Sequence, residues 1–202
     1  RDIGLSSKIR HKGPRLNHLK LMGRFAIGLP NNGAPYNLYD MADDVALLID
    51  RLGLDQPHII GASMGGMIAQ ILAAKYPEKI GKLGLIFTSN NQPLLPPPFP
   101  KQLFTLIGKP ESRDEQGIIN HSLKVFKTIG SPGYLNQLEA LQTARKLYQR
   151  SYHPAGVLQQ FLAILCTGSL LKLDKQIKKP TLVLHGSKDR LLPPSHGKAV
   201  AK

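Results

Sequence analysis

Apolar residues recur at helical spacing in two clear stretches of the chain. The segment YNLYDMADDVALLIDRLGLD predicts a helix that Asn37 can cap and that Gly53 ends, with an apolar face made of Met41, Val45, Leu48 and Leu52. The same spacing predicts a helix over 65–76, which ends before Pro77 and whose apolar face holds Met67, Ile68, Ile71 and Leu72. A shorter helix is predicted over 16–25.

Continuous apolar runs without helical spacing form a second pattern. They read PHIIG at 57–61, KLGLIFTS at 82–89 and TLVLHG at 181–186. Short strands that are apolar on both faces and alternate with helices are typical of a parallel sheet covered by helices. The sequence therefore predicts an α/β architecture in which each of these strands is buried.

A long insertion separates the second of these strands from the third. It covers residues 92–175, opens with the proline-rich NNQPLLPPPFP, and carries helical patterns near 99–108, 112–129, 133–150 and 154–166. This is far longer than a simple crossover needs. We therefore predict a helical subdomain at 92–175, inserted into a core made of 1–91 and 176–202.

Candidate chemistry begins with the run Gly61-Ala62-Ser63-Met64-Gly65, a G-x-S-x-G match between a predicted strand and a predicted helix. Such a sharp turn lifts a serine hydroxyl to the carboxyl edge of the sheet, and it requires glycine two residues before and two after it. The backbone N–H of Met64 would then face an oxyanion. A phosphate or dinucleotide loop needs other glycine spacings, so we predict that Ser63 is a nucleophile.

A serine nucleophile needs a base, and the base needs a carboxylate that orients it. Asp189 follows the 181–186 strand in a loop, on the same predicted sheet edge as Ser63. The order of serine before aspartate is that of α/β hydrolases. Asp189 is therefore the candidate acid, although an ordinary loop aspartate remains the alternative.

Composition narrows the function classes. Hydrophobic residues make up 42% of the chain, as in globular proteins, and the 27 Lys and Arg exceed the 13 Asp and Glu by 14 charges. The charge is scattered and lacks interleaved aromatic residues, so we expect no nucleic-acid partner. We expect no cofactor and no metal, because helix capping explains the three aspartates of 40–44 more simply than ligation does.

Two further observations concern the compartment. Cys166 is the single cysteine, which fits a reducing compartment, and we read it as a buried apolar residue. The chain has neither an apolar run of about 20 residues nor a short apolar segment behind a basic start. We therefore expect a cytoplasmic protein with no membrane partner.

Five segments together resemble the α/β hydrolase superfamily, and within it bacterial carboxylesterases and polyketide methylesterase-type serine hydrolases. They read RDIGLSSK, YNLYDMADDVALLIDRLGLDQPHIIGASMGGMIAQ, AAKYPEKIGKLGLIFTS, SYHPAGVLQQFLAIL and PTLVLHGSKDRLLPPSHGKAVA. The resemblance implies that Ser63 is the nucleophile, that Asp189 is the acid after strand seven, and that 92–175 is a cap over the site.

The same resemblance implies parts that these residues do not hold. Residue 1 corresponds to the end of strand four, so strands one to four and the second oxyanion donor are expected upstream, and 57–61 is expected to be an unprotected sheet edge. The catalytic histidine is expected beyond Lys202. We therefore expect an internal fragment that is almost inactive by itself, with His196 as the first candidate for a substitute base. We read His58 and His185 as structural residues, and His153 as a lining or packing residue of the cap.

The leading hypothesis is a serine hydrolase that cleaves a small carboxylic ester through an acyl-enzyme, with a small-molecule substrate. Carbon–carbon bond hydrolysis, aminopeptidase and perhydrolase activities use the same triad and stay open. Haloalkane dehalogenation is disfavoured, because it needs an aspartate where Ser63 stands. A non-catalytic or decayed binding protein is the alternative from another class. Attraction of the basic surface to an anionic substrate or an acidic carrier protein is a further alternative.

Overall fold

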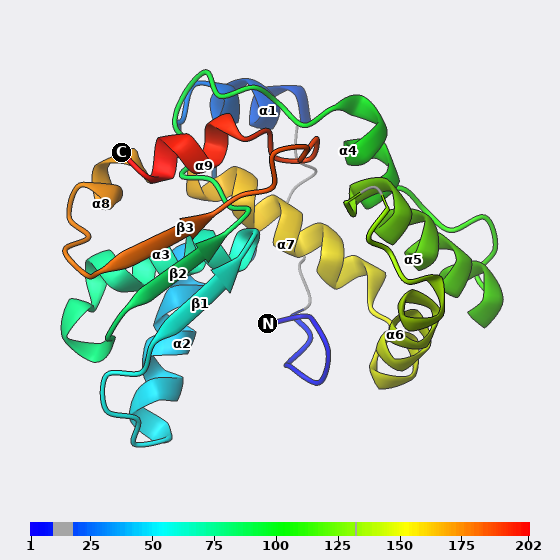
Figure 1. The fold of residues 1–202 in the computed structure, drawn as a ribbon, viewed down its shortest axis with the longest axis horizontal. Coiled ribbons are helices and arrows are strands. Elements are labelled where there is room, and N and C mark those ends of the chain that lie inside the picture. The colour runs from blue at the N-terminus through cyan, green and yellow to red at the C-terminus, as the bar shows by residue number, and fades with distance from the viewer. Residues whose placement is uncertain (10–17, 132) are drawn as a thin grey trace.

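The computed structural model describes residues 1–9, 18–131 and 133–202, and in them three strands form one parallel sheet (Figure 1). The strands are β1 (Ile59–Ala62), β2 (Leu83–Ile86) and β3 (Thr181–Leu184), in the order β1-β2-β3. Ile60 pairs with Gly84, which pairs with Leu182. The predicted α/β class is confirmed, with strands shorter than the apolar runs suggested.

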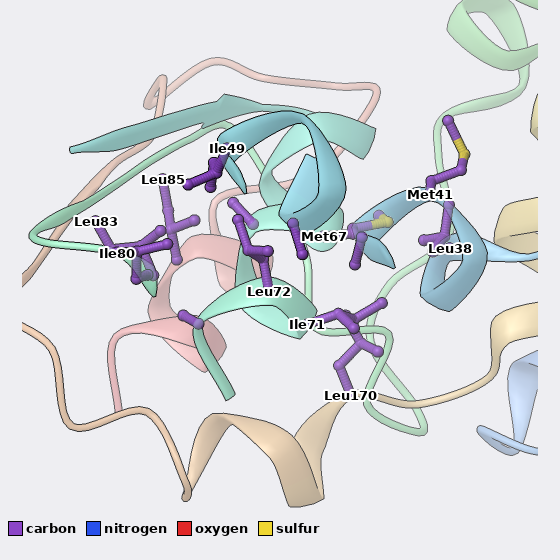
Figure 2. Close-up of a cluster of buried hydrophobic side chains, with 14 of the residues drawn as sticks. Leu38, Met41, Ile49, Met67, Ile71, Leu72, Ile80, Leu83, Leu85 and Leu170 are labelled. Carbon is purple, nitrogen blue, oxygen red and sulfur yellow. The ribbon is translucent and has the colours of Figure 1, made fainter. Parts of the chain in front are cut away.

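One face of the sheet is covered by helices. The helix α3 (Met64–Lys75) packs on β1 and β2, α2 (Leu38–Arg51) packs on α3, and α9 (Ser195–Val200) packs on β3. The main hydrophobic core lies between them, and Figure 2 shows α2 and α3 side chains meeting those of β2. Its most deeply buried members include Leu38, Ile71, Leu72, Ile80 and Leu85.

The other face of the sheet lies open among the described residues. Ile60 is 75% exposed, Leu182 60% and Leu184 49%, and the register places Ile60 and Leu182 in one row across that face. The prediction that each strand is buried on both faces is therefore wrong. An apolar run shows what a strand could bury, whereas its neighbours decide what it does bury. The strand β1 is also an edge of this sheet, as the sequence predicted.

The helix α2 begins directly after its capping residue, Asn37. The side chain of Asn37 accepts from the N–H groups of Tyr39 and Asp40, and the Asp40 carboxylate accepts from the N–H of Asn37. This reciprocal pair satisfies N–H groups that the first turn leaves free. The predicted apolar face is only partly correct: Met41 is buried, whereas Leu48 and Leu52 are 55% and 61% exposed. The remaining buried residues of α2 are Leu38, Ala42, Ala46 and Ile49.

The described residues of the predicted insertion form helices joined by loops. Between β2 and β3 lie α4 (Pro100–Ile107), α5 (Glu115–Ile129), α6 (Gln137–Arg150), α7 (Pro154–Thr167) and the short α8 (Leu171–Asp174). Figure 1 shows α4, α5 and α6 gathered at one end of the molecule, away from the sheet. The helix α7 runs back from them and contacts α2 and α1 (His18–Ala26), so it joins the insertion to the core. The start of the predicted 16–25 helix lies outside the described residues.

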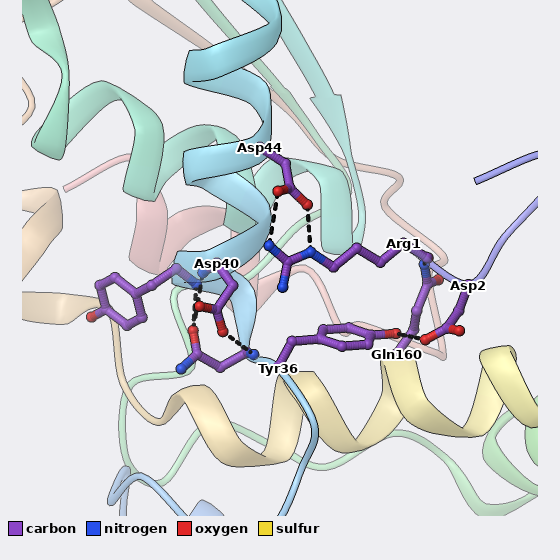
Figure 3. A network of polar contacts seen from close by, with 8 residues as sticks. Arg1, Asp2, Tyr36, Asp40, Asp44 and Gln160 are labelled. Carbon is purple, nitrogen blue, oxygen red and sulfur yellow. Dashed lines mark hydrogen bonds and ion pairs between the residues drawn. The ribbon is translucent and has the colours of Figure 1, made fainter. Parts of the chain in front are cut away.

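A polar network ties the amino-terminal residues to α2 and α7 (Figure 3). Asp2 is fully buried and accepts from the Tyr36 hydroxyl at 2.7 Å and the Ile9 N–H at 2.7 Å. Burial, and then the hydrogen bond to Asp2, raise the pKa of Tyr36. The Arg1 guanidinium pairs with Asp44 at 2.7 Å. These contacts hold residues 1–9, which form turns rather than a strand, against the core.

Two absences concern the described residues. No helix in the described ranges is both long and apolar enough to cross a membrane. Within the same ranges, no three His, Cys, Asp or Glu side chains gather as a metal site would require. The three aspartates of 40–44 make other contacts: Asp40 caps the helix, Asp43 pairs with Lys75, and Asp44 pairs with Arg1. Near Lys75, the pKa of Asp43 falls below its ordinary value.

Candidate active site

Ser63 occupies the tight turn between β1 and α3. Its backbone has φ 51° and ψ −121°, a left-handed conformation that L-residues with side chains seldom adopt. Its N–H donates to the Ile86 carbonyl at 2.9 Å, and its own carbonyl accepts from the Thr88 hydroxyl at 2.7 Å. The Ser63 side chain makes no hydrogen bond to the start of α3. The turn is thus fixed through its backbone, and the hydroxyl is left available for chemistry.

The glycines around Ser63 have different roles. A Cβ on Gly61 would collide with the carbonyl oxygen of Gly65, so the predicted close approach across the turn is present. A Cβ on Gly65, in contrast, would meet no atom within 4 Å in the described residues. A residue with a side chain would therefore fit at this position without a clash. Gly66 is the second crowded position, because a Cβ there would lie 2.6 Å from the Thr88 side chain.

Met64 is the first residue of α3, so its N–H has no acceptor within the helix. The amino end of a helix carries partial positive charge, which favours an anion close to it. Both features follow from a helix that starts one residue after Ser63. The Met64 N–H is therefore suited to hold an oxyanion formed at an acyl carbon that Ser63 has attacked.

Asp189 lies in the loop after β3 and is mostly buried. Its Oδ1 accepts from the N–H groups of Leu191 and Leu192 at 2.8 and 2.9 Å. Its Oδ2 lies 3.6 Å from Nε2 of His185, but that nitrogen is 2.8 Å from the Leu192 carbonyl oxygen, to which it donates. The backbone therefore orients one oxygen of the Asp189 carboxylate, and Oδ2 is left to accept a further donor.

The strand order sets the relation between these two side chains. Ser63 follows β1 and Asp189 follows β3, and in a parallel sheet both positions lie at the carboxyl edge. The strand β2 separates them, so at about 4.8 Å per strand the two strands lie roughly 10 Å apart. An imidazole placed between the Ser63 and Asp189 side chains could contact both. Among the described residues, no hydrogen bond joins these two side chains directly.

His196 is held at both ring nitrogens. Its Nδ1 lies 2.8 Å from the Ser89 hydroxyl and its Nε2 lies 2.9 Å from the Pro96 carbonyl oxygen. Because a carbonyl can only accept, Nε2 donates and Nδ1 accepts from Ser89. Burial lowers the pKa of His196. These contacts favour a structural role, and neither of them is with Ser63.

The other histidines named from the sequence also have structural contacts. His58 is exposed, and its Nδ1 accepts from the Lys82 N–H at 3.1 Å. His185 supports the Asp189 loop and lies against Gly197 of α9. Nε2 of His153 lies 3.8 Å from the buried Asp2 carboxylate.

Sequence reasoning missed the residues that brace the turn, above all Thr88 and Gly66. The signal was available only in part: Gly66 extends the glycine run, and Thr88 follows the apolar run of β2. Their contact joins residues more than 20 positions apart, so only the folded chain brings it about.

These observations can be compared with known proteins. The family model for the alpha/beta hydrolase fold matches residues 6–202, and the chain belongs to this family. It is 34% identical over 160 residues to a poly(3-hydroxyalkanoate) depolymerase of Ectopseudomonas oleovorans, a match that covers 79% of this chain and 54% of the depolymerase. It is 29% identical over 155 residues to a 2-hydroxy-6-oxo-6-phenylhexa-2,4-dienoate hydrolase of Comamonas testosteroni, over 74% of this chain and 52% of that enzyme.

Solved structures agree on the fold. A hydrolase from Pseudomonas aeruginosa superposes with a TM-score of 0.57 at 24% identity, over 86% of this chain and 62% of that structure. The enol-lactonase from Burkholderia xenovorans LB400 superposes with a TM-score of 0.62 at 20% identity, over 83% and 61%. The chain thus spans about half the length of the curated relatives that it matches.

Proposed function

We propose that this protein is a serine hydrolase that cleaves a small carboxylic ester through an acyl-enzyme intermediate. The observation that carries the proposal is the left-handed backbone of Ser63 between β1 and α3, which frees the hydroxyl beside the amino end of a helix. A positive φ strains the backbone of a residue that has a side chain, and such strain is typical of functional sites. Family membership gives further support.

In the proposed reaction, the Ser63 hydroxyl attacks the ester carbonyl, and a histidine takes its proton and passes it to the leaving alcohol. Water then attacks the acyl-enzyme by the same route and releases the acid. Asp189 would orient the histidine through Oδ2, and the Met64 N–H would stabilise each oxyanion. The helices of 92–175 would form a cap over the bound ester.

Labelling with a fluorophosphonate tests the nucleophile directly, because the reagent forms a covalent bond with an activated serine. In the longer protein that the resemblance implies, which we call the full-length protein, we expect one label, mapped to Ser63 by mass spectrometry. The label should be lost in Ser63→Ala. The exposed Ser131 offers a matched control, since Ser131→Ala should be labelled like the unaltered protein. Labelling that persists in Ser63→Ala would exclude the proposed nucleophile.

Hydrolysis of p-nitrophenyl acetate and butyrate tests the base. For the 202-residue chain, the rate above that of Ser63→Ala is measured with and without added imidazole, and circular dichroism confirms folding. Serine-dependent turnover that needs no imidazole in the unaltered chain, and that needs imidazole in a folded His196→Ala, would identify His196 as the base. Turnover that needs imidazole would instead mean that the base comes from outside these residues.

Carbon–carbon bond hydrolysis is the second candidate, because a relative with 29% identity carries the name of such an enzyme. The two candidates differ in substrate but share the triad. Turnover of 2-hydroxy-6-oxo-6-phenylhexa-2,4-dienoate with little turnover of esters would favour this candidate. Binding of an ester without any Ser63-dependent turnover in the full-length protein would favour a non-catalytic protein.

A further inference from the structure

The four residues Thr88–Asn91, which we call the 88–91 segment, form a buried polar connection between β2 and the helices that follow. Thr88, Ser89 and Asn90 are fully buried, and Asn91 is 7% exposed. Buried polar groups must find hydrogen-bond partners inside the protein. The partners of this segment lie in parts of the chain that are far apart in sequence.

On one side the 88–91 segment braces the Ser63 turn. The Thr88 hydroxyl donates to the Ser63 carbonyl at 2.7 Å, and the Thr88 side chain fills the space beside Gly66. The Ser89 carbonyl accepts from the Gln70 side chain of α3 at 3.1 Å. The first two turns of α3 are therefore held against the 88–91 segment.

On its other side the 88–91 segment holds the return of the chain from α7 to α8. The Asn90 carbonyl accepts from the Leu170 N–H at 2.7 Å, and the Asn90 side chain donates to Asp174 at 2.8 Å. The Asn91 side chain donates to the Gly168 carbonyl at 3.3 Å. The entry and the exit of the helical insertion are thus fixed to one another.

Among the described residues, two ionisable side chains hydrogen-bond to the 88–91 segment: Asp174, and His196, whose Nδ1 lies 2.8 Å from the Ser89 hydroxyl. Only Asp174 lies on the side of the helical insertion. Its Oδ1 is buried without a hydrogen-bond partner. Burial, partly offset by the bond from Asn90, raises the pKa of Asp174 to about 6. The neighbouring Lys172 and Lys175 are exposed and make no ion pair with it among the described residues, and Lys75, the only ionisable residue of α3, pairs with Asp43.

We propose that Asn90 and Asp174 are positioning residues, which set the helices of 92–175 relative to Ser63 through the 88–91 segment. The consequence for catalysis rests on the proposed hydrolase function. If the Asn90–Asp174 bond is lost, the Asn90 side chain no longer holds α8. The segment that braces Ser63 and Gly66 then keeps only its contacts with Leu170 and Gly168 on that side.

Hydrogen exchange measured by mass spectrometry tests this coupling without any need for activity. In Asp174→Ala and Asn90→Ala we expect exchange to rise on the order of fivefold both at 168–175 and at the start of α3, 63–67. Asp114→Ala removes the cap of α5, within the insertion but away from the 88–91 segment, and should raise exchange only near α5. A rise limited to 168–175 would overturn the proposal.

Asp174→Asn provides a variant that can still accept from Asn90 but cannot ionise. In the unaltered chain, protection at 168–175 and 63–67 should fall between about pH 4 and pH 7, as Asp174 ionises. That fall should be absent in Asp174→Asn. A fall of equal size in both would show that another group is responsible.

Activity of the full-length protein gives the catalytic readout. We expect Asp174→Ala to raise KM for p-nitrophenyl butyrate about three- to tenfold, with a smaller change in kcat, because ester binding depends on the position of the cap. Asp114→Ala should leave both constants nearly unchanged. If Ser63 takes no fluorophosphonate label, the proposed function fails, whereas the exchange experiment still decides the coupling. Equal KM values for Asp174→Ala and the unaltered protein would contradict the proposed effect of Asp174 on catalysis.

Discussion

The turn that presents the Ser63 hydroxyl depends on two nearby glycines, Gly61 and Gly66. The turn needs the Gly61 Cα close to the Gly65 carbonyl and the Gly66 Cα close to Thr88. In both cases a methyl group would occupy space that other atoms already fill. Gly65 is different, because its missing Cβ points into open space in the described residues.

This difference gives a matched pair of variants. Gly61→Ala should lower the free energy of unfolding by about 1–3 kcal/mol, since it overpacks the turn. Gly65→Ala should leave it unchanged or raise it by up to about 1 kcal/mol, because alanine favours helix over glycine. Urea unfolding of both variants measures the two values. Equal destabilisation by the two substitutions would contradict the asymmetry.

Asp174 makes stability depend on pH. Its pKa in the fold is about 6, above the value near 4 of an unfolded chain. Its favourable contribution is therefore fully present below about pH 4 and is lost as pH rises through about 6. We expect Asp174→Asn to be more stable than the unaltered chain at about pH 8 and to lose this advantage at about pH 4. Urea unfolding from about pH 4 to pH 8 measures this difference in the free energy of unfolding, with Asp114→Asn as the control.

Among the elements, α2 is specified locally more clearly than any strand. Asn37 and Asp40 form a reciprocal cap that needs no partner elsewhere in the chain. The strands, in contrast, have four residues each and depend on their neighbours.

Asn37→Ala tests the local contribution of this cap. Removing a capping side chain costs about 1 kcal/mol, and the loss should appear as a lower urea midpoint with an unchanged slope. Asn136→Ala removes the cap of α6, which packs on α5 rather than in the main core, and serves as comparison. A neutral Asn37→Ala would mean that packing alone holds the start of α2.

At the scale of the whole molecule, the open face of the sheet is the dominant feature. Ile60, Leu182 and Leu184 are apolar and exposed there, and no other strand of the described residues pairs with the outer edge of β1. Such edges and apolar faces promote association between chains.

We therefore expect the 202-residue chain to associate as its concentration rises. The double variant Ile60→Lys, Leu182→Lys should remain monomeric, because charge on this face opposes association. Leu48→Lys, Leu52→Lys places the same charges on exposed positions of α2 and is the control. Sedimentation velocity measures all three, and a monomeric unaltered chain at high concentration would contradict the expectation.

The sequence by itself determined the features that short stretches of chain encode. These are the capped helix α2, the order of strands and helices, the helices between β2 and β3, and the G-x-S-x-G turn, because spacing, capping and turn geometry act over a few residues. Only the tertiary structure decided that one face of the sheet is open, that Gly66 rather than Gly65 is crowded, and that Thr88 supports Ser63. Each of these depends on contacts between distant residues, and the local pattern of a sequence does not specify which distant segments will meet.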